Sequence, residues 1–191
     1  MRVNREQAAL NRERILDTAG TLFREHGFDG IGVADLMKGA GFTHGGFYGH
    51  FESKEDLMAQ ACTRALDKAV AYWQQTVASS PKDPLGTLTR AYLSTTHRDH
   101  PGKGCVLAAL GPDAARQGLQ VRRSLTDGLR ALVDIVAKIL PGRTAAARRE
   151  KALASYATFV GALVLARAVD DPKLSAEILK AASATVLDTA H

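Results

Sequence analysis

The chain has 191 residues, of which 46% are hydrophobic, an ordinary share for a water-soluble protein with one large domain or two smaller ones. No run of about 18 apolar residues indicates a membrane span, and the first residues lack the apolar stretch of a signal peptide. Two cysteines, Cys62 and Cys105, are too few for a disulfide framework. We therefore expect a cytoplasmic protein with no membrane partner.

The net charge of +5 is unevenly distributed. Residues 1–56 carry 7 Lys and Arg against 9 Asp and Glu, a balance of −2, whereas residues 57–191 carry 18 against 11, a balance of +7. The net charge of the N-terminal part therefore does not indicate nucleic-acid binding. DNA binding is indicated instead by where individual basic residues lie in the sequence. A basic N-terminal arm can follow the DNA backbone or minor groove, although Arg2 and Arg5 fit a solvated tail equally well. The basic residues concerned are Arg2, Arg5, Arg12, Arg14, Lys38 and Lys54.

Helical spacing of apolar residues predicts two helices near the N-terminus. The first covers residues 5–26 and has a buried face made of Ile15, Ala19, Leu22 and Phe23. The second is short and follows Gly32, which occupies its N-cap, with apolar residues at Val33, Leu36 and Met37. Either Gly39 or Gly41 can adopt the positive φ that ends a helix and turns the chain sharply.

Thr43 is a favourable N-cap and begins a third predicted helix, His44 to Phe51, on which Phe47 and Phe51 share one face. Ser53 caps a fourth helix whose first turn contains two acidic residues, as the helix dipole favours. Two short helices around a tight turn, followed by a helix that starts with a lysine, can place one helix in the major groove and contact the flanking phosphates.

The segment from about Ile15 to Leu57 resembles the DNA-binding domain of the TetR family of bacterial repressors. The resemblance is carried by G-F-D-G, then V-x-D-L, then the string A-G-F-T-H-G-G-F-Y-G-H-F-E-S-K-E-D-L. It implies an all-α protein with an N-terminal three-helix helix-turn-helix DNA-binding domain over residues 1–53. A larger helical domain for ligand binding and dimerisation would follow over residues 54–191.

The resemblance implies base or sugar–phosphate contacts by Thr43, His44 and Gly46, phosphate contacts by Tyr48, His50 and Lys54, and further positions on the same surface at Gly32 and Gly45. Two departures from the family pattern matter. Where family members commonly have Lys, this chain has His44, so a titratable group replaces a fixed charge. Gly45 and Gly46 each weaken the recognition helix by about 1 kcal/mol relative to Ala, so base readout would lean on few side chains and on DNA shape.

The remainder of the chain is also predicted to be helical, because no segment alternates with the period of a strand. Loops are expected at 79–84 and 98–104, which are rich in Pro, Gly and Ser. The helices expected between and after them cover residues 54–78, 85–97, 105–117, 121–140, 144–169 and 172–189.

The last two predicted helices carry apolar residues at helical spacing, with small residues among them. The resemblance implies that these helices form a homodimer, and a palindromic operator requires a two-fold protein. The alternative is that the same faces only close the core of the monomer. The positions concerned are Leu153, Tyr156, Ala157, Val160, Gly161, Leu163, Val164, Ala168, Leu174, Ile178, Ala182 and Val186.

The middle helices would then enclose a ligand pocket. Aromatic and aliphatic residues of this kind are more often core than ligand contacts, but few charges are candidates for burial in this half. We therefore expect a mostly apolar or aromatic small molecule as effector. The candidate ligand-binding residues are Trp73, Leu93, His97, Cys105, Leu107, Tyr156 and Phe159.

Cys105 opens a predicted helix after a loop rich in histidine, arginine and lysine. A thiol at a helix N-terminus close to cations is more reactive than an ordinary thiol, so Cys105 is a candidate sensor of electrophiles or oxidants. The alternative is a small buried apolar residue. His97, His100 and Cys105 are only a weak candidate for a metal site, since one flexible loop would supply all three ligands.

No phosphate-binding glycine motif, HExxH or GxSxG is present, so we expect no enzyme activity, no cofactor and no metal. The sequence therefore predicts a homodimeric transcriptional repressor that a small molecule releases from a palindromic DNA operator. One alternative is a thiol-based electrophile or redox sensor acting through Cys105. Another is a helical ligand-binding protein whose DNA function is vestigial.

Overall fold

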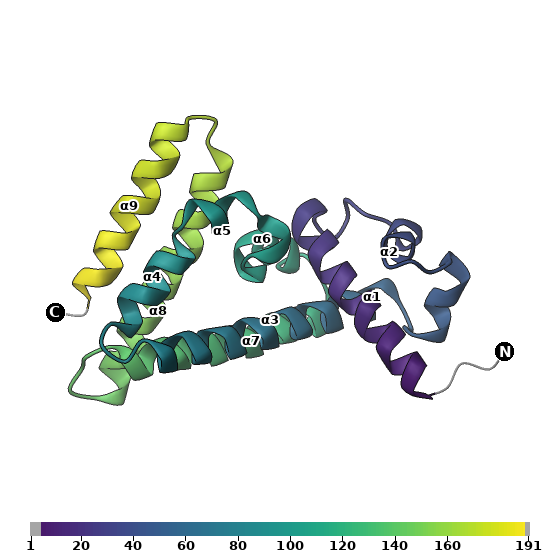
Figure 1. The fold of residues 1–191 in the computed structure, drawn as a ribbon, viewed down its shortest axis with the longest axis horizontal. Helices are drawn as coiled ribbons and strands as arrows, with labels where there is room; N and C mark the ends of the chain where they lie inside the picture. Colours follow the sequence, from purple (N-terminus) through teal and green to yellow (C-terminus); the bar gives the residue numbers. More distant parts are fainter. Residues whose placement is uncertain (1–4, 190–191) are drawn as a thin grey trace.

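The computed structural model describes residues 5–189, and over that range every regular element is a helix (Figure 1). This confirms the predicted all-α fold. The elements are α1 (Arg5–His26), α2 (Val33–Gly39), η1 (His44–Gly49), α3 (Lys54–Ser79), α4 (Pro84–Tyr92), α5 (Thr95–Asp99), η2 (Pro101–Lys103), α6 (Val106–Ala114), α7 (Leu119–Ile139), α8 (Ala145–Ala168) and α9 (Pro172–Asp188).

The N-terminal helices α1 and α2 lie with η1 at one end of the molecule, and the hairpin of α8 and α9 lies at the other (Figure 1). The long helix α3 leaves the N-terminal unit and runs beside α7, and it packs against both α1 and α7. Gly128 allows α7 to approach α3 closely, because a Cβ at that position would lie 2.6 Å from Leu66 Cδ1. Burial of apolar side chains along α3 therefore holds the two halves of the chain together.

The N-terminal unit has its own apolar centre, formed as the helical spacing predicts. Ile15, Ala19 and Phe23 of α1 are almost completely buried, and Phe23 meets Phe28 edge to face at 5.3 Å between ring centroids. Leu22, predicted on the same face, is only partly buried at its edge.

Side-chain caps explain where several helices begin. Ser53 Oγ accepts a hydrogen bond from Asp56 N at 3.0 Å and starts α3, as predicted. Asp83 does the same for α4, Thr144 for α8 and Asp171 for α9. Each cap satisfies a backbone donor that has no partner within the helix.

The single helix predicted over residues 85–97 is wrong. The chain forms α4 and α5 with a break at Leu93 and Ser94, because Ser94 Oγ accepts a hydrogen bond from His97 N at 3.1 Å and so caps a new helix. The predicted loop after it contains η2, and the helix predicted over 105–117 is the shorter α6, which continues through Pro112 to Ala114.

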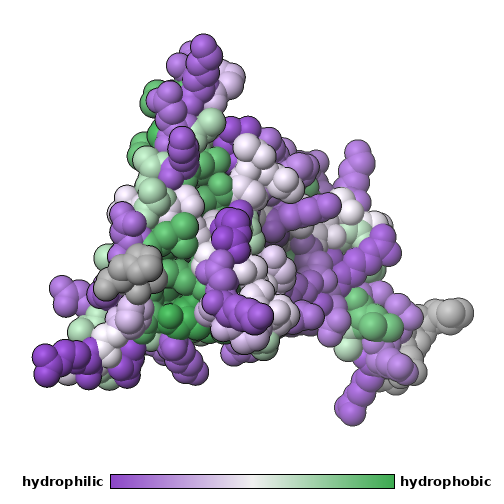
Figure 2. Space-filling model, turned by 60° about the vertical axis from the view of Figure 1, so that its left-hand side comes forward, coloured by the Kyte–Doolittle hydropathy of each residue, from purple (hydrophilic) through white to green (hydrophobic). Residues whose placement is uncertain are grey.

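The hairpin of α8 and α9 presents apolar surface to its outer side, and Figure 2 shows it as a band down that end of the molecule. Leu153, Leu165 and Leu174 are 46%, 56% and 43% exposed. By contrast, Tyr156, Leu163 and Val186, which the sequence grouped with this face, are buried in the monomer. Part of the predicted dimer pattern therefore closes the core instead.

Helix α8 is long and apolar enough, by length and composition, to cross a membrane, with a mean hydropathy of 1.2 over 18 residues. Its apolar stretch is interrupted by Ser155 and Thr158, so the expectation of no clear membrane span is not overturned. The same test is passed by core helices of soluble proteins, and α8 packs against α7 and α9, so this is weak support for a membrane span.

Gly41 has φ of +81°, and Gly41→Ala should destabilise the N-terminal unit by about 1–2 kcal/mol because side chains rarely adopt this conformation. The added Cβ would also lie 2.8 Å from Arg14 Nη2. Urea unfolding gives the free energy change. Gly45→Ala is the control, because its Cβ would meet no atom within 4 Å. Equal losses in the two variants would contradict the conformational explanation.

Candidate nucleic-acid interface and ligand cavity

The segment after α2 presents a row of polar side chains to solvent. Thr43, His44 and Tyr48 are exposed, Tyr48 at 71%, whereas Phe47 and Phe51 beneath them are 2% and 3% exposed. Gly41 supplies the sharp turn before this segment through its positive φ. The geometry of a helix, a tight turn and an exposed second helical element is therefore present, with Phe47 and Phe51 in the core as predicted.

The recognition element differs from the predicted helix over residues 44–51. It is a 3₁₀ helix, His44–Gly49, and Thr43 stands at its N-cap without making a side-chain cap hydrogen bond. Three of its six residues are glycine, and glycine lacks the intrinsic preference that sustains an α-helix. The rings of His44 and Tyr48 meet edge to face at 6.1 Å, so these two side chains support each other on the surface.

Of the other predicted DNA-contact residues, Gly45 and Gly46 lie within this element, whereas Gly32, His50 and Lys54 flank it. Gly32 and Gly45 are exposed, whereas Gly46, His50 and Lys54 are half-buried. Lys54 is the first residue of α3, and within residues 5–189 it forms no ion pair. Its ammonium group is therefore available to a phosphate.

Two of the predicted basic residues have structural contacts. The guanidinium of Arg12 lies 5.0 Å from the centre of the Phe51 ring, and that of Arg14 lies 5.8 Å from the centre of the Phe42 ring. Such cation–π contacts fasten α1 to the recognition segment. Arg2 lies outside the described residues.

A cavity of about 770 Å³ lies where α1 meets the middle helices. One of its walls is the C-terminal half of α1, from Leu16 to Arg24, and the opposite walls come from α3, α4 and the segment from Ser94 to Val106. Sequence reasoning missed the α1 wall, because contacts between α1 and η2 join residues far apart in the chain.

Four predicted ligand-binding residues line this cavity: Trp73, His97, Cys105 and Tyr156. The other three, Leu93, Leu107 and Phe159, are absent from the lining. Phe159 is fully buried and stacks at 4.9 Å against the ring of Tyr92, behind the cavity wall. The lining also includes four charged residues, Asp17 and Arg24 from α1 and the exposed Lys68 and Lys103, while no charged side chain of residues 54–189 is buried, as expected.

Cys105 is the N-cap residue of α6 and is partly exposed in this cavity. Its sulfur lies 3.7 Å from Tyr156 Oη, and its backbone N–H donates to His97 Nε2 at 2.9 Å. His97 Nδ1 lies 2.6 Å from the carbonyl oxygen of Tyr92. These contacts fit a neutral imidazole that donates from Nδ1 and accepts at Nε2. His97 therefore positions Cys105 rather than supplying a cation beside it.

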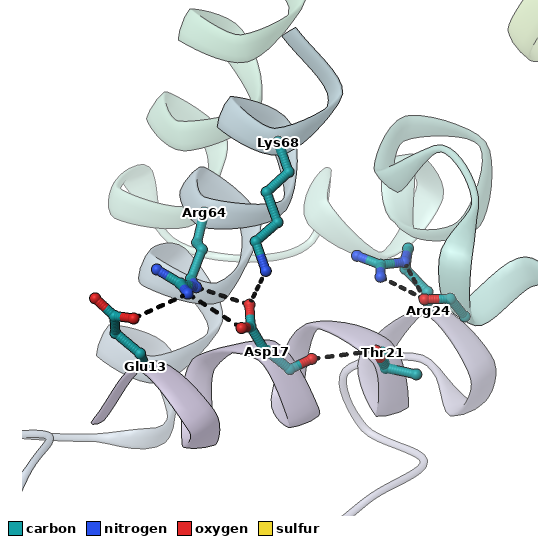
Figure 3. Close-up of polar contacts among 7 residues, drawn as sticks. Glu13, Asp17, Thr21, Arg24, Arg64 and Lys68 are labelled. Atoms are coloured by element: carbon teal, nitrogen blue, oxygen red, sulfur yellow. Dashed lines mark hydrogen bonds and ion pairs between the residues drawn. The ribbon is translucent and has the colours of Figure 1, made fainter. Parts of the chain in front are cut away.

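Charged contacts connect α1 to α3 at the rim of the cavity (Figure 3). Arg64 Nε and Nη2 donate to the two Asp17 carboxylate oxygens at 2.7 and 3.1 Å, and Lys68 also pairs with Asp17. The hydrogen bond from Arg64 is the largest cause that lowers the pKa of Asp17, and Lys68 adds to it. Farther along α1, the Arg24 guanidinium donates to the carbonyl oxygen of Gly102 in η2 (Figure 3).

Another contact attaches the end of α1 to the middle helices. The backbone N–H of Phe28 donates to Asp113 Oδ2 of α6 at 3.4 Å.

Across residues 5–189, no group of three or more His, Cys, Asp or Glu side chains could hold a metal ion. The chemistry that the cavity offers is therefore binding by aromatic surfaces, hydroxyl groups and cations, together with one thiol.

His97 generates a pH dependence of stability. Burial is the main cause that lowers its pKa, so the folded chain binds this proton less readily than the unfolded chain does. The His97 contribution is therefore complete above the unfolded value of about 6.5 and is lost as pH falls, by at most about 1.4 kcal/mol per pH unit. Urea unfolding at about pH 7.5 and about pH 5.5 should show a steeper loss in wild type than in His97→Gln. Identical slopes would contradict this role.

The comparisons with known proteins agree with the helix-turn-helix geometry. Residues 15–61 match the family described as bacterial regulatory proteins, tetR family. The chain is 37% identical over 86 residues to the HTH-type transcriptional repressor KstR2 of Rhodococcus jostii, covering 45% of this chain and 41% of that protein. It is 31% identical over 87 residues to the HTH-type transcriptional regulator AcrR of Shigella flexneri, covering 46% and 40%. These alignments span about two fifths of the length of both curated relatives.

The solved structure of E. coli NemR in its reduced form has a similar fold, with a TM-score of 0.78 at 22% identity, covering 94% of this chain and 97% of that one. This similarity extends the agreement in fold to the middle and C-terminal helices. The match of the N-terminal helices and the shared fold lead to one conclusion: residues 15–61 are those of the tetR family of bacterial regulatory proteins, and the whole chain has the fold of the solved NemR structure.

Proposed function

We propose that this protein is a DNA-binding transcriptional repressor that a small molecule releases from a palindromic operator. The observation that carries the proposal is the exposed row Thr43, His44 and Tyr48 beside the unpaired Lys54, within a segment that matches the family. Thr43 and His44 would face base edges, and Tyr48, His50 and Lys54 would contact phosphates. With so few side chains on η1, DNA shape would supply part of the specificity.

A homodimer through α8 and α9 would provide the two-fold symmetry of such an operator. The exposed apolar band on this hairpin supports the proposal (Figure 2). Small residues would let the partner helices approach closely, and a Cβ added at Gly161 would meet no atom within 4 Å of the same chain. The residues offered to a partner copy are Leu153, Ala157, Val160, Gly161, Val164, Leu165, Leu174, Ile178 and Ala182.

The position of α1 explains how a ligand would change DNA binding. The same helix supplies buried residues to the N-terminal unit and one wall of the cavity. A ligand that fits one position of α1 better than another would shift the spacing of the two recognition elements in the dimer. The ligand can shift the equilibrium between the two arrangements only by the difference between its affinities for them.

Lys54→Ala should weaken binding to all DNA sequences and lower the dependence of log affinity on log salt by about 1, because one phosphate contact is lost. Tyr48→Phe should weaken binding severalfold, about 1 kcal/mol for one hydrogen bond. Fragments selected from genomic DNA with the purified protein would serve as probes. Lys82→Ala, an exposed lysine in the loop before α4, is the control and should leave affinity and salt dependence unchanged.

Recovery of a short inverted repeat, bound well above non-specific DNA, is the expected result of that selection. Weak binding without sequence preference, together with no effect of Lys54→Ala, would overturn the repressor proposal. It would favour a ligand-binding protein whose DNA function is vestigial.

A second candidate function is sensing of electrophiles through Cys105. The observation that favours it is the partial exposure of this thiol within the cavity, close to the bond that joins Arg24 to η2. Cys62 provides the internal contrast, because burial raises the pKa of its thiol to about 12. In this reaction the Cys105 thiol would lose its proton to solvent and add to the C=C bond of an α,β-unsaturated carbonyl compound. The sulfur–carbon bond forms as the carbon–carbon π bond breaks, and solvent protonates the resulting enolate. The larger side chain would displace the segment around Gly102.

Labelling with iodoacetamide distinguishes the two thiols. The Cys105 thiol, measured in Cys62→Ser, should react faster than a cysteine in an unfolded peptide, and alkylation should release DNA. The Cys62 thiol, measured in Cys105→Ser, should react much more slowly because it is buried and protonated. Both variants should react alike in urea. A Cys105 rate no faster than that of the peptide would exclude the sensor function.

A further inference from the structure

One arginine that lines the cavity, Arg24, and one that lies against Gly104 of its wall, Arg167, form no ion pair in the described chain. Arg24 lines the cavity and donates only to the carbonyl oxygen of Gly102. Arg167 donates from Nε to Arg98 O at 3.0 Å and from Nη2 to His97 O at 2.7 Å. Neither forms an ion pair with a carboxylate anywhere in residues 5–189. Desolvation is the first cause that lowers the pKa of both, as expected for half-buried charges without a counter-ion.

Both guanidinium groups act on the same place. Arg24 donates to the carbonyl oxygen of Gly102, three residues before Cys105, and Arg167 donates to the carbonyl oxygen of His97, whose ring accepts the Cys105 N–H. The Nη1 atom of Arg167 is buried and has no hydrogen-bond partner. Two positively charged groups therefore lie close to the segment that carries Cys105, Arg24 in the cavity wall and Arg167 behind it.

The hydroxyl group of Tyr92 is a second unpartnered donor there. Tyr92 lines the cavity and is only 5% exposed, yet its oxygen has no hydrogen-bond partner in the described chain. Burial raises its pKa well above the usual value, so the hydroxyl keeps its proton near neutral pH. Leaving such a donor unpaired costs about 1–3 kcal/mol, which a bound acceptor would recover.

The remaining surface near this end is aromatic. The Trp73 ring lies edge to face with the Tyr92 ring at 5.9 Å, and 5.8 Å from the Tyr156 ring. Tyr72, the residue before Trp73 in α3, is more exposed and also lines the cavity. A planar apolar group would find matching surface beside the cationic end.

We propose that the cavity binds an aromatic carboxylate, with the carboxylate beside Arg24 and the Tyr92 hydroxyl near Cys105, where Arg167 adds positive charge from behind the wall, and with the ring against Trp73. This deepens the proposed function by naming the chemical class of the effector, and it rests on the proposed role of the cavity as an effector site. The carboxylate provides the missing counter-ion and the missing acceptor at once. The cavity volume of about 770 Å³ is ample for one or two rings with a short side chain.

The experiment uses the intrinsic fluorescence of Trp73, the only tryptophan in the chain, to follow binding without DNA. The probes are phenylacetate, 3-phenylpropanoate and 4-phenylbutanoate, each compared with its neutral amide, with calorimetry as a second readout. We expect at least one carboxylate to bind about tenfold or more tighter than its amide, a difference of about 1.4 kcal/mol.

Two variants test the groups that hold the carboxylate. Arg24→Gln should reduce the preference for carboxylate over amide to less than about threefold, whereas Arg24→Lys should retain most of it because the charge remains. General damage to the cavity would lower the affinity of both ligands equally and leave this ratio unchanged. Tyr92→Phe should weaken carboxylate binding about fivefold without loss of stability, because its hydroxyl has no partner to lose.

Ser155→Ala is the matched control for Tyr92→Phe. Ser155 is also buried with an unpartnered hydroxyl, but it does not line the cavity, so ligand affinity should not change. Equal affinity for carboxylates and amides, or no response to any carboxylate at concentrations of about 10 mM, would overturn the proposal. Because binding is measured without DNA, a failure here is distinct from a failure to bind an operator.

Discussion

The structure depends on α3, a single helix of 26 residues that packs against α1 on one side and α7 on the other. Apolar side chains along it, from Leu57 to Trp73, are buried, and the glycine at position 128 lets α7 lie close to Leu66. A continuous helix transmits displacement because its backbone hydrogen bonds resist bending. The N-terminal helices therefore cannot move freely relative to the middle of the chain.

A second set of contacts holds α1 against α3 and η2. Helix α1 is joined to α3 by Asp17 with Arg64 and Lys68, and to η2 by Arg24 with the carbonyl oxygen of Gly102 (Figure 3). Exposed ion pairs contribute little to stability individually, but they fix where α1 lies. Because α1 is also a wall of the cavity, an occupant of the cavity touches a helix of the N-terminal unit directly.

Some polar groups around the cavity are held by hydrogen bonds, and others have no hydrogen-bond partner in the described chain. His97 uses both ring nitrogens to hold Tyr92 and the Cys105 backbone, which leaves it uncharged. The Tyr92 hydroxyl and Arg167 Nη1 have no partner within the described chain. Buried donors are normally paired, so a group left unpaired beside a cavity indicates where a ligand acceptor is needed. The same cluster encloses the Cys105 thiol, so the binding and thiol-sensing hypotheses concern one site.

The sequence by itself determined the helices and their caps, because these depend on residues only a few positions apart. The cap at Ser53 and the burial of Phe47 and Phe51 follow from local pattern, which also limited the positive φ to Gly39 or Gly41, and the structure has it at Gly41. The local pattern gave the wrong structure where conformational preferences were weak, as in the glycine-rich η1 and at the break between α4 and α5 at Ser94. Only the tertiary structure decided the cavity, because its α1 wall is held by a contact between Arg24 and Gly102, which are 78 positions apart in the chain. Such contacts are set by the packing of whole helices and leave no periodic signal in the chain.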